Sequence, residues 1–165
     1  DCLLYSKKRR YDINFEQFRE KLISLLRENN ISFCEIKAGK FGSYERQHYF
    51  DLLNKSRLTI NLSLDECPGI LNYESMFFNV PVIGSKNNVP INADDVYYVN
   101  DTDFMTESYL VRKEDAASKY CKKIKEILQL DRTKINCREF IKNHTSFEAY
   151  QDRVENLLEV IRDDV

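Results

Sequence analysis

Short apolar runs alternate along this chain with longer segments whose apolar residues recur every three to four positions. The short runs predict β-strands at residues 2–5, 31–36, 58–62, 80–83 and 96–99. The helical spacing predicts helices at residues 15–26, 49–53, 68–78, 117–128, 135–141 and 145–161. Strands and helices that alternate in this way form right-handed βαβ units. The sequence therefore predicts an α/β fold with a Rossmann-like parallel sheet flanked by helices.

The composition is typical of one globular domain. The chain has 165 residues, of which 42% are hydrophobic and 32% are charged, so we expect a single domain over residues 1–165. The formal net charge is −2, and general nucleic-acid binding needs a basic excess, so we expect no nucleic-acid partner. No apolar run approaches the roughly 20 residues that a membrane-spanning helix requires. The first residues also lack the pattern of a signal peptide.

The five cysteines are odd in number and form no C-x-x-C pair. This pattern disfavours a disulfide framework or a zinc site and predicts reduced thiols in a cytoplasmic protein. The two histidines, His48 and His144, belong to no cluster, so we expect no bound metal and no cofactor.

The loops at one edge of the predicted sheet are the places to look for a ligand, because ligands on parallel sheets bind outside the carboxyl ends of the strands. All four glycines and all three prolines lie between residues 39 and 90, where turns and close backbone approaches should concentrate. The candidate loops are residues 6–11, 38–44, 63–68 and 84–95.

Glu74 has an unusual position in the predicted helix. At roughly 100° per residue it falls within an arc of apolar side chains. That arc is formed by Ile70, Leu71, Phe77 and Phe78, and the opposite side carries Asn72, Ser75 and Asn79. Burying an unpaired carboxylate is costly, so we expect an internal ion pair with Lys or Arg, an edge position that reaches water, or hydrogen bonds from a ligand. A vicinal diol suits the last role, because both of its hydroxyls can donate to one carboxylate.

The start of the same helix is suited to a phosphate. Pro68 fits the first helical position, and the backbone N–H groups of Gly69, Ile70 and Leu71 have no partner within the helix. A nucleoside diphosphate sugar has matching parts: Glu74 would bind the ribose, the helix start a phosphate, and Glu66 the sugar. The alternative for Glu66 is an ordinary acidic residue favoured by the helix dipole.

The run E-C-P-G-I-L-N-Y-E at residues 66–74, followed by N-V-P-V-I-G-S at residues 79–85, resembles the E-x7-E motif of retaining GT-B glycosyltransferases (glycosyl transferases group 1). The motif belongs to their C-terminal, donor-binding domain. Cys67-Pro68 replaces the family's usual Gly-Phe. Asn79 replaces a glycine, a change that the left-handed conformation of asparagine tolerates.

The resemblance implies one half of a GT-B fold, in an enzyme that transfers a hexosyl unit from a nucleoside diphosphate sugar to a hydroxyl acceptor with retention of the anomeric configuration. By the resemblance, Glu66 would contact the transferred sugar and Glu74 would bind the ribose. The backbone of Gly69, Ile70 and Leu71 would lie beside the phosphate and sugar. Lys7, Lys8 or Arg9 would bind the diphosphate, and the base would stack on Phe41 or Tyr44. Cations and the helix dipole stabilise the leaving diphosphate, so the resemblance implies no metal.

The acceptor-binding N-terminal domain of such enzymes has no counterpart in the 165 residues. We expect it in the same protein or in a separate chain, and we expect this domain alone to bind donor weakly. One alternative is a non-catalytic Rossmann-like module for nucleotide binding or protein interaction, in which Lys7, Lys8 and Arg9 would point away from Glu66. A flavodoxin-like receiver domain needs acidic residues at the end of the first strand, and residues 5–7 offer none.

Overall fold

The computed structural model describes residues 1–7, 13–37, 46–63, 70–85, 96–99 and 112–145. They contain five strands: β1 (Cys2–Ser6), β2 (Phe33–Lys37), β3 (Leu58–Asn61), β4 (Val82–Ser85) and β5 (Val96–Val99). The strands form one sheet in the order β2-β1-β3-β4-β5, and every neighbouring pair is parallel. The predicted α/β fold with a Rossmann-like parallel sheet is therefore confirmed.

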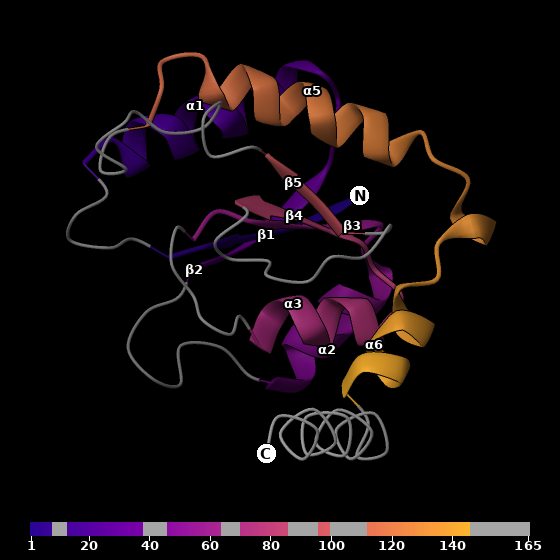
Figure 1. The fold of residues 1–165 in the computed structure, drawn as a ribbon. Coiled ribbons are helices and arrows are strands. Elements are labelled where there is room, and N and C mark those ends of the chain that lie inside the picture. Colours follow the sequence, from indigo (N-terminus) through magenta and orange to yellow (C-terminus); the bar gives the residue numbers. More distant parts are fainter. Residues whose placement is uncertain (8–12, 38–45, 64–69, 86–95, 100–111, 146–165) are drawn as a thin grey trace, which may run out of the picture.

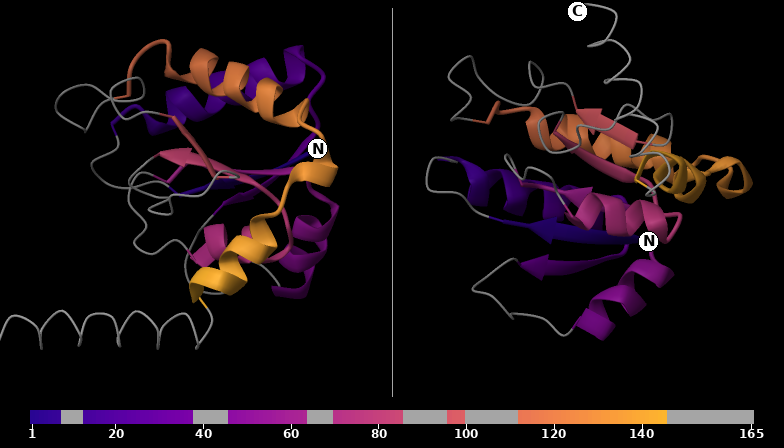
Figure 2. Two further views of the ribbon diagram at one scale, coloured as in Figure 1. Left: turned by 45° about the vertical axis from the view of Figure 1, so that its right-hand side comes forward. Right: turned by 60° about the horizontal axis from the view of Figure 1, so that its bottom comes forward.

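Helices cover both faces of this sheet. They are α1 (Phe15–Glu28), α2 (Arg46–Lys55), α3 (Ile70–Phe77), α5 (Ala116–Leu128) and α6 (Cys137–Thr145), with a short 3-10 helix at Arg132–Lys134. Helices α1 and α5 lie on one face, and α2, α3 and α6 lie on the other (Figures 1 and 2). The predicted helix at residues 145–161 falls, apart from its first residue, outside the described residues. Among the described helices, none is both long and apolar enough to cross a membrane.

The core lies on both faces of the sheet, because successive side chains of a strand point to opposite faces. On strand β1, Leu4 packs into the cluster under α1 and α5, whereas Leu3 and Tyr5 pack into the cluster under α2 and α3. The burial of all five residues of β1 fits its place inside the sheet, between β2 and β3. The apolar runs of the central strands thus reflect burial on both faces.

Asn79 ends α3 in the left-handed conformation, with a φ of 59°. The expected left-handed conformation of this asparagine is therefore confirmed. The N–H of the next residue, Val80, donates to the carbonyl of Ser75 at 3.0 Å, and Pro81 has no N–H to donate. Strand β4 therefore begins at Val82, two residues later than the apolar run predicts.

Candidate functional site

Strands β1 and β3 end side by side at the carboxyl edge of the sheet. Tyr5 is the register partner of Asn61, and the N–H of Leu62 donates to the carbonyl of Tyr5 at 2.9 Å. Strand β2 lies on one side of β1 in the sheet, and β3, the next strand of the chain, lies on the other side of β1. This is the point at which the strand order reverses, where open α/β sheets bind their ligands.

Helix α3 is attached to β3 by buried polar side chains. The side-chain amide of Asn61 donates to Asn72 Oδ1 at 3.0 Å, and the Ser75 hydroxyl donates to Thr59 Oγ1 at 2.9 Å. The Asn61 Oδ1 atom accepts from the backbone N–H of Ser63 at 3.0 Å, so the same side chain also holds the backbone just after β3. The helix and the start of this loop therefore share one hydrogen-bonded network.

This attachment corrects the predicted orientation of α3. The predicted apolar arc is not the buried face, because Ile70 is 68% exposed and Phe77 is 52% exposed. The buried residues of the helix are Leu71, Asn72, Ser75 and Met76. The helical wheel assumes that polar side chains face water, but here β3 directs Thr59 and Asn61 toward the helix. Buried polar groups need partners, so the polar side of α3 faces the sheet.

Glu74 is held by an arginine from another helix. Its Oε1 atom accepts from Arg46 Nη2 at 3.1 Å. The Glu74 side chain is 22% exposed and that of Arg46 is 76% exposed. An ion pair with arginine is therefore present, but it is not the expected internal pair, because its cationic partner lies at the surface.

The neighbours of Arg46 are aromatic. Its guanidinium carbon lies 5.2 Å from the centroid of the Phe50 ring, and the Phe50 ring stacks on that of Phe78 with centroids 5.5 Å apart. Arg46 is the first residue of α2, which follows β2, so it lies on the side of the sheet where the strands end. Figure 1 shows α2 and α3 side by side below the sheet. The ion pair thus lies near the carboxyl edge.

The other predicted site residues divide into two groups. Lys7 directly follows β1, Leu71 is buried at 6% exposure, and Ile70 begins α3 with an exposed side chain. The remaining predicted residues lie outside the described part of the chain; they are Lys8, Arg9, Phe41, Tyr44, Glu66 and Gly69.

A second charged pair, which the sequence analysis missed, lies beside the end of β1. Both Arg19 Nε and Nη2 donate to the Glu35 carboxylate, and the buried Ser6 hydroxyl donates to Glu35 Oε1 at 2.8 Å. Burial raises the pKa of Glu35, but the hydrogen bonds from Arg19 and Ser6 outweigh that effect, so its pKa lies below the ordinary value. The hydrogen bond to Glu35 is the largest cause of a raised pKa at Arg19.

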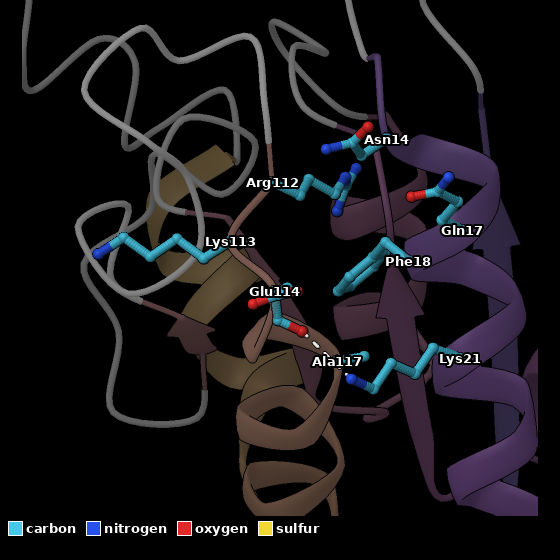
Figure 3. A pocket seen from close by; sticks show the side chains of 8 residues that line it. All are labelled: Asn14, Gln17, Phe18, Lys21, Arg112, Lys113, Glu114 and Ala117. Carbon is cyan, nitrogen blue, oxygen red and sulfur yellow. Dashed lines mark hydrogen bonds between the residues drawn. The ribbon is translucent and has the colours of Figure 1, made fainter.

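Arg112, like the pair of Arg19 and Glu35, makes a contact that no local sequence pattern predicts. It is 3% exposed, its Nη2 donates to the carbonyl of Leu62 at 2.8 Å, and its guanidinium lies 4.2 Å from the centroid of the Phe18 ring. It lines a pocket of about 220 Å³ between α1 and the start of α5 (Figure 3). The figure shows the Arg112 guanidinium directed toward α1 and the Lys113 side chain pointing away from it. Arg112 thereby ties the segment before α5 to the residue after β3.

No group of three or more His, Cys, Asp or Glu side chains in the described ranges could hold a metal ion. Comparison of the chain with protein-family models gives no match, and comparison with the curated proteins gives none either.

Proposed function

We propose that this chain is the donor-binding domain of a glycosyltransferase and that Glu74 binds the ribose of a nucleoside diphosphate sugar. The observation that carries the proposal is the E-x7-E spacing of Glu66 and Glu74, with its second carboxylate on the helix that follows β3. Lys7, Lys8 or Arg9 would bind the diphosphate and Glu66 the sugar. The base would stack on Phe41 or Tyr44.

The sheet supports this proposal through the position of its strand ends. Lys7 follows β1, Glu66 comes after β3 in the sequence, and β1 and β3 are neighbours in the sheet. A cation after the first strand and a helix start after the third would therefore converge on one ligand. Helix dipoles and cations stabilise the charge of a leaving diphosphate.

The proposed reaction replaces one bond of the donor. The bond between the anomeric carbon of the hexose and the diphosphate oxygen breaks, and the nucleoside diphosphate leaves with the bonding electrons. An acceptor hydroxyl forms the new bond to the anomeric carbon, and its proton passes to the leaving diphosphate or to water. By resemblance, the anomeric configuration is retained. An N-terminal domain, in the same protein or in another chain, would supply the acceptor.

Calorimetric titration with UDP, GDP and ADP tests the proposal and identifies the base. Glu74→Ala should weaken binding of the preferred nucleotide about tenfold to a hundredfold, the usual effect of losing hydrogen bonds to a charged group. Glu66→Ala should weaken it less, because a nucleoside diphosphate carries no sugar for Glu66 to contact. Glu126→Ala, which removes a half-exposed acid on α5, is the matched control. Equal affinities of the wild type and Glu74→Ala would contradict the ribose role.

The ion pair between Arg46 and Glu74 favours a second candidate, a non-catalytic Rossmann-like module in which Glu74 has only a structural role. This candidate predicts that Glu74→Ala leaves the affinity for each of the three nucleotides unchanged, whether or not the wild type binds them. The same titration therefore separates the two functions.

A further inference from the structure

We infer that Arg46 competes with the hydroxyls of the ligand for the Glu74 carboxylate, so that donor binding must displace this arginine. The inference rests on the proposed function, because it concerns access to the carboxylate that would hold the ribose. It adds a residue that the E-x7-E motif does not contain and that stands 28 positions from its partner.

The exposures of the two side chains indicate how the carboxylate is reached. Glu74 is 22% exposed, and Arg46, which is bonded to it, is 76% exposed. The arginine is therefore on the solvent side of the pair. A ligand that approaches Glu74 from solvent meets the guanidinium at the place where its own hydroxyls would have to donate.

The contact is one that a ligand can break. A single nitrogen of Arg46 bonds a single oxygen of Glu74, at 3.1 Å, and no second hydrogen bond of this carboxylate occurs within the described residues. Two-point Arg–carboxylate pairs are stronger and more rigid. The guanidinium also rests on the Phe50 ring, a contact that it can keep while it turns away from Glu74. Displacement should thus cost little.

The expected effect is small and has a definite sign. Ion pairs with an exposed partner contribute little to stability, so removing Arg46 should tighten nucleoside binding only about two- to fivefold. High salt weakens exposed pairs, since the screening length falls to about 3 Å at 1 M. The wild type should therefore bind a nucleoside more tightly at high salt, whereas a protein without Arg46 should change less.

The experiment uses neutral nucleosides, because their binding does not respond directly to a lost positive charge near a phosphate. Uridine, guanosine and adenosine are titrated into the wild type, Arg46→Met and Arg27→Met at low salt and at about 1 M NaCl. Methionine keeps an unbranched side chain without the donors. Arg27 is the matched control, because its guanidinium also rests on an aromatic ring, that of Phe33, at 5.8 Å.

Competition is supported if Arg46→Met binds the preferred nucleoside more tightly than the wild type at low salt, and if Arg27→Met does not. Unchanged or weaker binding by Arg46→Met, while wild-type binding still depends on Glu74, overturns the competition and leaves the proposed function standing. If neither nucleosides nor nucleoside diphosphates bind any of the proteins, both ideas fail together.

Discussion

Glu35 and Arg19 show how a partly buried charged pair is held in this domain. The Glu35 side chain is 15% exposed and that of Arg19 is 12% exposed. The Glu35 carboxylate accepts two hydrogen bonds from Arg19 and one from Ser6. A buried carboxylate without such donors would be strongly destabilising, so the pair is needed as a unit. Ser6 is the last residue of β1, and the pair therefore also fixes the end of the strand beside the candidate site.

The lowered pKa of Glu35 makes stability depend on pH. Because its folded pKa lies below the unfolded value, the carboxylate stabilises the fold at pH values above the unfolded pKa. This contribution is lost as the pH falls through the folded pKa. Glu35→Gln should lower the free energy of unfolding at pH 7 by about 1–3 kcal/mol, and its difference from the wild type should shrink below about pH 4.

Urea unfolding of both proteins between pH 3 and about pH 8 measures this difference. Glu126→Gln, a change at a half-exposed acid on α5, should have little effect at any pH. A difference between Glu35→Gln and the wild type that stays constant with pH would show that the ionised carboxylate is not what stabilises the fold.

At the scale of elements, the connection from α3 to β4 depends on one asparagine. Asn79 has a φ of 59°, its side-chain amide donates to the carbonyl of Ile135 at 3.0 Å, and its Oδ1 accepts from the N–H of Arg138 at 3.2 Å. The backbone conformation suits glycine or asparagine, whereas the two side-chain bonds require asparagine. These bonds link the end of α3 to the segment that opens α6.

Two substitutions separate the backbone role of Asn79 from its side-chain role. Asn79→Gly should lose only the bonds to Ile135 and Arg138, and Asn79→Ala should also lose about 1 kcal/mol because alanine disfavours the left-handed conformation. Thermal and urea unfolding should therefore rank the proteins as wild type, then glycine, then alanine. At Asn30, where φ is 55°, alanine should again be less stable than glycine. An alanine variant as stable as the glycine variant would contradict the backbone role.

The elements were largely predictable from sequence, and the face of α3 was not. The runs at residues 58–62 and 96–99 are rich in β-branched or aromatic residues, which is typical of strands. Local periodicity contains that information. The orientation of α3 depends on Thr59 and Asn61, which lie in another element, and a wheel drawn for one helix cannot include them.

For the whole molecule, the same reason explains why the site was predicted only in part. The spacing of Glu66 and Glu74 is local and could be read directly. Arg46 is 28 positions from Glu74, and Arg112 is 50 positions from Leu62. Such partners are brought together by the sheet order, which a pattern of apolar residues does not specify.

The reactivity of the cysteines tests the packing of the whole fold, because their thiols differ in exposure to solvent. Cys34 is exposed on β2, while Cys2, Cys121 and Cys137 are buried. Burial raises the pKa of Cys2 to about 12 and also raises that of Cys121, so neither supplies thiolate at neutral pH.

The labelling experiment uses a Cys67→Ser background, because Cys67 lies outside the described residues. A thiol reagent should modify Cys34 quickly and the three buried cysteines only when the protein unfolds. Mass spectrometry of the labelled peptides measures the order of reaction. Rapid modification of Cys121 in the native protein would contradict the packing of α5 against α1.

The hydrogen bonds between α3 and β3 have a consequence for how this helix can vary. Apolar contacts have no preferred direction. A helix held only by such contacts can shift along its axis or rotate about it when neighbouring side chains change size. Bonds between Asn61 and Asn72 and between Thr59 and Ser75 set an angle as well as a distance. Rotation of α3 about its axis would break both hydrogen bonds at once. The direction in which Glu74 faces is therefore fixed by these four residues of α3 and β3.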